Sequence, residues 1–369
     1  MTGAKRTGAE RGRVSDEPRP TDAGRVGGNR GLAGAEQEGE ERADSGTDGV
    51  RAGVERDEAT RRDSNALAAA AENPCARFLF VSGSRVAVEP GAERVLAVSA
   101  GCVAPEARRR AVYLGLVDGA PYFACDIGDA DDSARDPRVV SRAIPAASRP
   151  AAVAEGDERA WSVSADFASV PLTSHLWPSV EAELAVEAVA ISNWIGGTRF
   201  CHRCGEPLSL RSGGWEMVCG RGHTVFPRVD PAVIMAVRDA EDRLLLARNG
   251  RWAPGRLSVL AGFVEAGEPL ESAVAREVLE ETGVVVDDVA YVTSQPWPFP
   301  RSLMLAFEGR TRARQEDVKV DGEELVFARF FSREEFSGAL ASGEIGLPTP
   351  TSVSARLIER WLGRPLADV

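Results

Sequence analysis

The sequence predicts an α+β fold that is spread over more than one domain. Three observations support this prediction. The chain has 369 residues, which exceeds the usual size of a single domain. Short apolar runs bounded by turn residues indicate strands. Apolar residues at helical spacing, in several segments between and after those runs, indicate helices.

Residues 1–74 are expected to form a disordered tail. They are rich in Gly, Ala, Arg, Asp and Glu and have almost no large apolar side chains, so they cannot bury enough surface to fold. Their many acidic residues argue against a transit peptide, and no secretory signal is present. The six cysteines of the chain suggest a reducing compartment rather than a disulfide scaffold, which predicts a cytoplasmic protein.

Residues 75–195 are expected to form a smaller α/β domain. Its predicted strands lie at Phe78–Val81, Val95–Val98, Ala111–Val117 and Tyr122–Cys125. The last two would form a hairpin across the turn at Asp118-Gly119, and Ala182–Trp194 would form a helix. This domain shows no catalytic arrangement of side chains, so we expect its role to be structural.

Residues 196–227 contain a cysteine motif. Two residues separate Cys201 from Cys204, fourteen more follow, and three residues then separate Cys219 from His223. Paired cysteines at this spacing are typical of a zinc ribbon. A structural zinc with four protein ligands has no open position, so such a site would stabilise the fold without taking part in a reaction.

Residues 228–369 are expected to form the catalytic domain. Its predicted strands lie at Pro231–Val237, Arg243–Arg248, Val289–Val292, Leu303–Phe307 and Glu323–Phe331. The turn Asp239–Asp242 would join the first two strands, and Val353–Leu362 would form an amphipathic helix near the end of the chain.

One predicted helix of this domain carries three glutamates. Pro269 suits its beginning, and Gly283 suits the position just after its end. At about 100° per residue, Glu277 and Glu281 lie on the apolar line of this helix, and Glu280 lies about 60° aside. Such carboxylates repel one another and are costly to desolvate, and a divalent cation would relieve both problems. Oxygen ligands of this kind favour Mg²⁺ or Mn²⁺.

The residues around this helix resemble the Nudix box. Gly262 is followed after five residues by Glu268, and seven residues later by the run Arg276-Glu-Val-Leu-Glu-Glu-Thr-Gly-Val284. The resemblance implies the Nudix fold, which is a mixed sheet between helices. It also implies hydrolysis of a nucleoside diphosphate that is linked to another moiety. Gly262 and Gly267 would allow a tight loop before the helix.

The same resemblance implies the roles of several charged residues. The metal-binding glutamates of the box would be Glu277, Glu280 and Glu281. Arg276 would fix a glutamate through a charged hydrogen bond. Glu324 matches an additional metal-binding glutamate outside the box, and its neighbour Glu323 is the rival for that role. A carboxylate opposite the helix would complete a site for several metal ions.

Ser294–Ser302 contains three prolines that alternate with aromatic and polar residues. Proline removes the backbone donor and fixes φ, so this segment cannot be a central strand and is expected to be a stiff loop. The segment is similar to the signature of the NADH pyrophosphatase branch of the Nudix family. That resemblance implies that the loop selects the dinucleotide through Gln295 and Trp297. It also implies that Phe226 and Phe263 stack on the substrate.

The NADH pyrophosphatase branch carries a four-cysteine zinc ribbon, from which this sequence departs. Gly222 stands where the fourth cysteine would fall, and His223 follows it. Either His223 completes a zinc site with three cysteines, or the site is empty and packing around Trp215 holds the ribbon. For residues 75–195, the comparison with the family implies a role in forming a homodimer.

The predicted function is metal-dependent hydrolysis of the pyrophosphate bond of NADH and NAD⁺ to AMP and nicotinamide mononucleotide. Glu281 would accept the proton of the attacking water, with Glu280 or Glu324 as alternatives. Three other functions stay open: removal of NAD caps from RNA 5′ ends, general hydrolysis of ADP-ribose or dinucleotides, and a non-catalytic sensing or interaction module. The net charge of −12 and the pI near 5.0 argue against a broad nucleic-acid-binding surface. No stretch is apolar enough to span a membrane.

Overall fold

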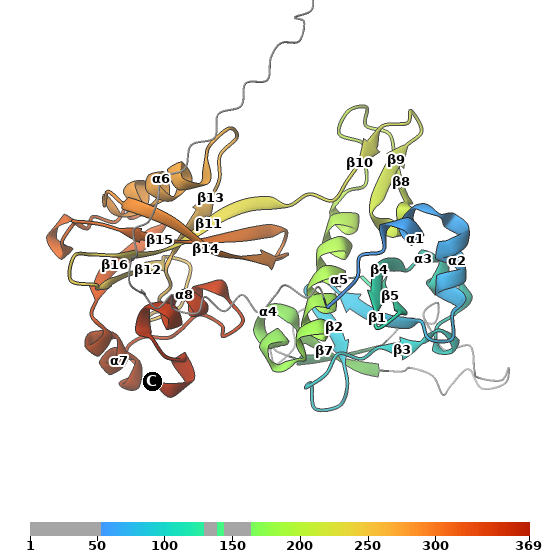
Figure 1. Ribbon diagram of the computed structural model, residues 1–369, viewed down its shortest axis with the longest axis horizontal. Coiled ribbons are helices and arrows are strands. Elements are labelled where there is room, and N and C mark those ends of the chain that lie inside the picture. The colour runs from blue at the N-terminus through green and yellow to red at the C-terminus, as the bar shows by residue number, and fades with distance from the viewer. Residues whose placement is uncertain (1–52, 129–138, 144–163) are drawn as a thin grey trace, which may run out of the picture. The chain divides into compact units, whose positions relative to one another are not determined.

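The structure is a computed structural model, and it describes residues 53–128, 139–143 and 164–369 (Figure 1). Residues 1–52, which belong to the expected tail, lie outside the described residues. Within the described part, strands form three sheets and helices pack against two of them. This arrangement confirms the predicted α+β fold.

The first sheet has seven strands in the order β4-β5-β1-β2-β7-β6, with β3 paired to β1. The parallel pair is β1 with β5, and the other pairs are antiparallel. Its strands are β1 (Arg77–Ser82), β2 (Arg85–Val88), β3 (Val98–Ser99), β4 (Val112–Val117), β5 (Ala120–Asp126), β6 (Val139–Ala143) and β7 (Ser164–Ser169).

The hairpin of β4 and β5 forms as predicted. Its turn residues Asp118 and Gly119 have φ angles of 49° and 76°, and a type I′ turn requires both to be positive. The predicted strand at Val95–Val98 is wrong in extent. Only Val98–Ser99 forms a strand, because Val95 makes a single bridge to Val88 after the chain has turned.

Two apolar cores cover the faces of this sheet. On one face, α5 (Ser179–Gly197) contains the predicted helix and buries Leu184 and Ile191 against Leu79 and Leu114. On the other face, the rings of Phe78 and Phe123 stack with their centroids 4.9 Å apart. The short helices of this region are η1 (Ala100–Cys102), α3 (Pro105–Arg110), α4 (Val170–Thr173) and η3 (Ser174–Leu176).

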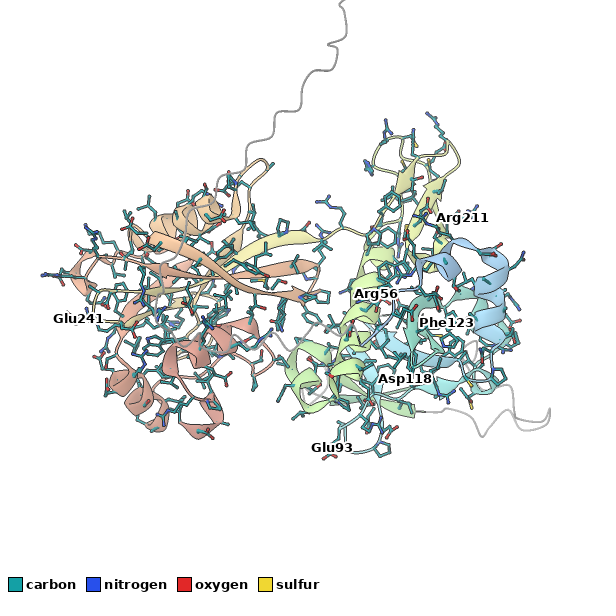
Figure 2. All side chains as sticks on the ribbon, in the orientation of Figure 1. Arg56, Glu93, Asp118, Phe123, Arg211 and Glu241 are labelled. Carbon is teal, nitrogen blue, oxygen red and sulfur yellow. The ribbon has the colours of Figure 1, made fainter. Side chains whose placement is uncertain are left out.

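Residues 53–74 are folded, so the tail prediction is wrong for this segment. They form α1 (Glu58–Arg62) and α2 (Ser64–Glu72). Val54 is completely buried, and the hydroxyl of Tyr113 donates a hydrogen bond of 2.7 Å to Asp57. Arg56, which is labelled in Figure 2, forms an ion pair with the buried carboxylate of Glu187 on α5. Composition missed this segment because a few apolar side chains, among them Val54 and Leu67, are enough to attach it together with polar caps and ion pairs.

The second sheet is the ribbon, with three antiparallel strands. They are β8 (Leu208–Arg211), β9 (Glu216–Cys219) and β10 (Thr224–Val225), and η4 (Ser212–Gly214) lies between the first two. The indole N–H of Trp215 donates a hydrogen bond of 2.7 Å to the carbonyl of Tyr113. This bond ties the ribbon to β4 of the first sheet.

The third sheet has the strand order β14-β15-β11-β12-β16, with β13 paired to β11. The pair of β11 with β15 is parallel and the other pairs are antiparallel, so the sheet is mixed. Its strands are β11 (Asp230–Arg238), β12 (Leu244–Asn249), β13 (Leu260–Phe263), β14 (Asp287–Trp297), β15 (Ser302–Arg310) and β16 (Leu325–Phe331). These strands contain most of the predicted segments, but Glu323 and Glu324 precede β16.

Helices cover both faces of the third sheet (Figure 1). On one face, α6 (Leu270–Thr282) buries Val274 and Val278. On the other face, α8 (Val353–Leu362) has the predicted bounds and packs with α7 (Arg333–Ala341). The two short helices are η5 (Gln315–Asp317) and η6 (Leu366–Asp368).

The expected stiff loop at Ser294–Ser302 is only partly a loop. Ser294 to Trp297 belong to β14, where Pro296 is opposite Leu303 of β15. The prediction was wrong because β14 is the edge strand of its sheet, and an edge strand can lack one backbone donor at no cost to the ladder. All three prolines of the segment lie outside the central strands of the sheet, and β15, a central strand, begins only at Ser302.

Candidate active site and metal centre

The bounds of α6 determine where its glutamates point. Pro269 directly precedes the helix and Gly283 ends it with a φ of 70°, as the sequence predicts. Glu281 is 6% exposed, whereas the side chain of Glu280 is 61% exposed. The helix therefore points Glu281 toward the sheet and leaves Glu280 at the rim.

Arg276 organises the carboxylates around α6. Its guanidinium forms two hydrogen bonds with Glu268, of 2.8 and 2.9 Å, and one each with Glu277 (2.9 Å) and Glu280 (3.1 Å). It also donates to the carbonyl of Phe263 at 3.0 Å. The bidentate bond to Arg276 lowers the pKa of Glu268 to about 2, so this carboxylate stays charged.

The carboxyl of Glu281 has a raised pKa and an unpaired oxygen atom. Burial, together with the negative charges of Glu324 and Glu277, raises the pKa of its carboxyl to about 8. Its Oε2 atom is buried and has no hydrogen-bond partner. Burial also raises the pKa of Glu277, against the opposing effect of Arg276. A buried carboxylate oxygen without a partner, among other carboxylates, is a position that suits a cation.

Gly262 has a different role from the one expected. It lies within β13, opposite Val233 of β11, and not in a turn. A Cβ atom at this position would lie 1.9 Å from Cδ of Glu277. Glycine is needed here because the carboxylate of Glu277 approaches the strand. Gly267 does have the expected positive φ, at 87°.

Glu324 and Glu281 line the same cavity, although one precedes β16 and the other lies in the last turn of α6. The backbone N–H of Glu324 bonds to Asp321 at 3.1 Å, and its carbonyl accepts a bond of 3.0 Å from Gly250. Glu323, the adjacent rival, is exposed and does not line the cavity. Position therefore favours Glu324 over Glu323.

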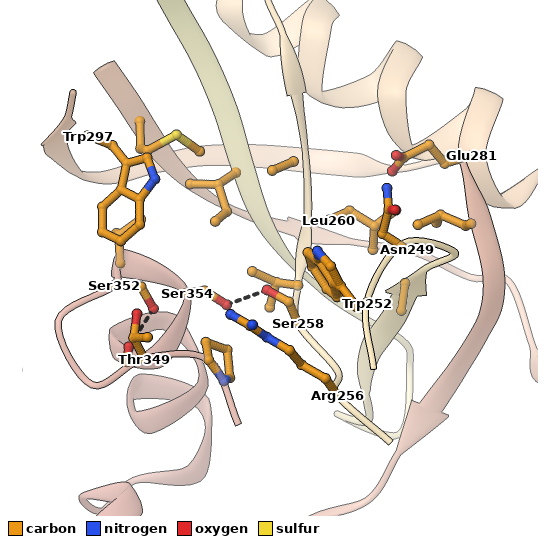
Figure 3. Close-up of a pocket in the computed structure, with 18 of the residues that line it drawn as sticks. Asn249, Trp252, Arg256, Ser258, Leu260, Glu281, Trp297, Thr349, Ser352 and Ser354 are labelled. Atoms are coloured by element: carbon orange, nitrogen blue, oxygen red, sulfur yellow. Dashed lines mark hydrogen bonds between the residues drawn. The ribbon is translucent and has the colours of Figure 1, made fainter. Parts of the chain in front are cut away.

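The cavity beside the glutamates has a volume of about 290 Å³. Figure 3 shows Glu281 and Asn249 at one end and Trp297 at the other, with Trp252 and Arg256 along the side. Ser258 and Ser354 share a hydrogen bond of 2.7 Å in its wall. Such a space combines carboxylates, indole rings and one cation, which suits a polar aromatic ligand.

Several residues of this cavity were missed by the sequence analysis. They are Asn249, Trp252, Arg256, Ser258, Ser352 and Ser354. The loop of Trp252 and Arg256 comes next to the site because Leu257 and Gly346 pair their backbones at 3.1 Å. The one available signal was Trp252 in a polar, glycine-rich and proline-rich loop, where a large aromatic residue is not needed for a core.

The predicted substrate-contact residues fall into two groups. Gln295 and Trp297 line the cavity. The amide of Gln295 is already occupied, because it donates to the carbonyl of Thr351 at 2.6 Å and accepts from the N–H of Val353 at 2.7 Å. Gln295 therefore fixes the start of α8. Phe226 and Phe263 are 62% and 60% exposed and do not line the cavity.

The ribbon brings its cysteines and histidine together. The ligand atoms of Cys201, Cys204, Cys219 and His223 all lie within 4.8 Å of one another. Nδ1 of His223 is 3.6 Å from Sγ of Cys201. Although burial opposes it, backbone N–H groups of Arg203 and Cys204 help lower the pKa of the Cys201 thiol to about 6. Three sulfur atoms and one imidazole nitrogen are a donor set that fits zinc.

Gly222 explains why histidine can replace the fourth cysteine. It has a φ of 78°, and its N–H bonds to the carbonyl of Cys219 at 2.9 Å. This turn directs the chain so that the next residue, His223, faces the other ligands. Among the residues that the structure describes, this is the one group of at least three potential ligand atoms gathered so closely.

The mixed sheet, the glutamate helix and the adjoining cavity define a hydrolase domain of the Nudix type. Comparison with protein families agrees. A family described as NUDIX domain matches residues 228–348. A second, described as NADH pyrophosphatase-like rudimentary NUDIX domain, matches residues 75–194. The chain belongs to the NADH pyrophosphatase-like branch of the Nudix hydrolase family, as the sequence motifs predicted.

Individual relatives support this assignment. A protein of Mycobacterium bovis named NAD-capped RNA hydrolase NudC is 37% identical over 304 residues, which cover 80% of this chain and 88% of that protein. A NudC of Mycobacterium tuberculosis matches equally well. A protein of Macaca fascicularis named NAD-capped RNA hydrolase NUDT12 is 38% identical over 195 residues, covering 49% of this chain and 42% of that protein.

Proposed function

We propose that this protein hydrolyses the pyrophosphate bond of NADH and NAD⁺, giving AMP and nicotinamide mononucleotide. The observation that carries the proposal is the buried, partnerless carboxylate oxygen of Glu281, which lies among other carboxylates and faces a cavity with two indole rings. The carboxylates suit a metal-bound diphosphate, and the indoles suit the flat bases at its ends.

The cation would be Mg²⁺ or Mn²⁺, and its ligands would be Glu277, Glu280, Glu281 and Glu324. Burial is the main cause of the raised pKa of Glu281 and Glu277, and repulsion from neighbouring carboxylates adds to it. That repulsion supports this set, because a bound cation would remove it. When bound, the cation neutralises phosphate charge and makes a water molecule more acidic. Arg276 would position Glu277 and Glu280 through its hydrogen bonds to both.

Glu281 is our choice for the residue that accepts the proton of the attacking water. It is the most buried of the four carboxylates, and burial makes a carboxylate a stronger base. Glu280 and Glu324 are the alternatives.

We assign contact with the substrate to Trp252 and Trp297 rather than to Phe226 and Phe263, since only the tryptophans line the cavity.

The test is turnover of NADH and of NAD⁺ with either cation, with products identified by mass. Glu281→Gln should lower kcat by about 10²–10⁴-fold and leave the unfolding temperature unchanged or higher. Glu323→Gln is the matched control, because it removes the same charge outside the cavity. Wild-type turnover by Glu281→Gln, or no cleavage by the folded wild type, would refute the proposal.

Removal of NAD caps from RNA is the second candidate function. The specific observation in its favour is that relatives covering most of this chain are named NAD-capped RNA hydrolases. The same bond would be cleaved by the same residues. A comparison of kcat/KM for free NAD⁺ and for RNA with a 5′ NAD cap would decide between the two candidates.

Four further parts of the proposal concern organisation. Residues 75–195, 196–227 and 228–369 would act as the first domain, the zinc ribbon and the catalytic domain. A structural zinc would occupy the ribbon, a homodimer would form through the first domain, and the protein would act in the cytoplasm. Among the helices that the structure describes, none has the length and apolarity that a membrane crossing requires.

A further inference from the structure

A groove lined by arginines lies between the ribbon and the helices α1, α2 and α3. Its cavity volume is about 750 Å³. The cations that line it, named here the arginine groove, are Arg61, Arg62, Arg109, Arg110 and Arg211. Glu216 is the one acidic residue of the lining, and its carboxylate accepts a hydrogen bond of 2.8 Å from Ser212. Positive charge is therefore concentrated here, although the whole chain has a net charge of −12.

Arg61 is paired: its largely buried guanidinium lies 3.7 Å from the carboxylate of Glu187. The other four arginines are neutralised weakly or not at all. Arg62 pairs with Glu58 and Arg109 with Glu106, but all four of these side chains are more than 60% exposed, and such pairs are weak. Arg110 and Arg211 have no carboxylate within 4.0 Å among the residues that the structure describes. Figure 2 shows Arg211 on the ribbon, where its guanidinium donates to the carbonyl of Leu210.

The walls of the groove are held in fixed positions. A Cβ atom at Gly214 would lie 2.9 Å from the methyl groups of Val112, so the ribbon backbone packs directly on β4. The guanidinium of Arg61 lies 3.9 Å from the centre of the Trp215 ring, and a hydrogen bond joins it to the carbonyl of Leu114. These contacts hold the ribbon against the first sheet and keep the groove open between them.

We propose that the arginine groove binds the phosphate backbone of a single-stranded nucleic acid. Guanidinium groups form charge-assisted hydrogen bonds with phosphate, and a row of them follows a charged backbone. Leu67 and Leu210 also line the groove and offer apolar surface to sugars and bases. Arg61 is held by Glu187 and Trp215, which leaves Arg62, Arg109, Arg110 and Arg211 to meet a ligand. Four arginines from α1, α3 and β8 are more than one phosphate ion can contact, so the groove suits a chain of phosphates.

This inference goes beyond hydrolysis of the free dinucleotide, because NADH and NAD⁺ have no phosphate chain to place in such a groove. It also refines the prediction, made from the net charge, that the protein has no broad nucleic-acid-binding surface. A protein of pI 5.0 has no broad basic surface, but it can hold a nucleic acid at one local site. An RNA whose 5′ end is a substrate of the cavity would be one such ligand.

The experiment compares three proteins by fluorescence anisotropy: the wild type, Arg110→Ala/Arg211→Ala, and Arg312→Ala/Arg364→Ala. The last pair is the matched control, since both residues are exposed, lie in the third-sheet region and have no carboxylate partner in the described chain. The probe is a labelled, uncapped, single-stranded RNA of about 20 nucleotides, long enough to exceed one binding site. Its affinity is measured over a series of salt concentrations.

We expect the groove variant to bind this RNA at least about tenfold more weakly than the control at about 0.1 M salt. The plot of log affinity against log salt should become shallower by about 1.4, because each phosphate contact contributes about 0.7 for single strands. Equal binding by the groove variant and the control would overturn the proposal. So would displacement of the RNA by millimolar inorganic phosphate at constant ionic strength, since that result indicates a site for a single anion.

Hydrolysis of NADH by the same three proteins separates this inference from the proposed function. All three should be equally active, because the mutated arginines lie outside the cavity of Glu281. Absence of hydrolysis in every protein, with groove-dependent RNA binding retained, would refute the proposed function and leave the nucleic-acid site standing. Equal RNA binding by the groove variant and the control, with normal hydrolysis of NADH, would refute the nucleic-acid site and leave the proposed function standing.

Discussion

Gly262 of β13 and Glu277 of α6 are so close that only glycine at position 262 leaves the carboxylate of Glu277 where it is. The Cβ of any other residue would lie 1.9 Å from Cδ and 2.2 Å from Oε2 of Glu277. The first glycine of the motif thus leaves space for the carboxylate of Glu277, which lies fifteen positions later in the sequence. Because the obstacle is the end of a flexible side chain, a larger residue would displace the carboxylate rather than unfold the domain.

Gly262→Ala should therefore reduce activity more than stability. We expect kcat/KM to fall by about 100-fold, since a displacement of a metal ligand by about 1 Å has that effect. The unfolding temperature should change little. Gly338→Ala in α7 is the control, because a Cβ there meets nothing within 4 Å. Equal losses of activity in the two variants would show that the contact with Glu277 is irrelevant.

Arg276→Lys tests the hydrogen bonds that hold the glutamates. A lysine keeps the charge but cannot contact Glu268 in bidentate form and also reach Glu277 and Glu280. We expect the Mg²⁺ concentration that gives half-maximal activity to rise by about 10–100-fold. A metal titration of activity measures it, with Arg312→Lys as the control at an exposed arginine. An unchanged titration would mean that Arg276 only stabilises the loop before α6.

Site residues could be predicted from the sequence where they are close together along the chain. They could not be predicted where tertiary contacts bring distant residues together. The glutamates of α6 repeat with the helical period, so their common face could be predicted. Trp252 and Arg256 reach the cavity because a loop pairs with the backbone at Gly346, a contact that no local pattern encodes. The helices of residues 53–74 were missed because their attachment depends on Glu187, more than a hundred positions away.

The ribbon should contain zinc, with His223 as the fourth ligand. Metal analysis of the wild type should find about one zinc ion per chain. His223→Ala should lose most of it and unfold at a lower temperature, because a structural zinc stabilises the folded state. His223→Cys should retain the metal, whereas Cys75→Ser, at an exposed thiol outside the cluster, should resemble the wild type. Zinc content unchanged in His223→Ala would exclude the histidine as a ligand.

Glu187 links the helices of residues 53–74 to α5 and makes stability depend on pH. Its side chain is 5% exposed and lies 3.7 Å from Arg61, and it also pairs with Arg56. Burial raises the pKa of its carboxyl to about 7, although both arginines oppose the shift. Because the folded state binds this proton more tightly than the unfolded state, the stabilisation is complete below pH 4.5 and is lost as the pH rises toward 7.

Glu187→Gln removes this proton-linked effect, so its stability relative to the wild type should rise with pH. Between about pH 4.5 and pH 7 the difference in unfolding free energy should change by up to about 3 kcal/mol in favour of the variant. Loss of the partner of Arg56 adds a penalty, but arginine stays charged throughout, so that penalty is independent of pH. Urea unfolding at several pH values measures the trend. Glu183→Gln, a more exposed neighbour on α5, is the control, and a flat difference for Glu187→Gln would contradict the raised pKa.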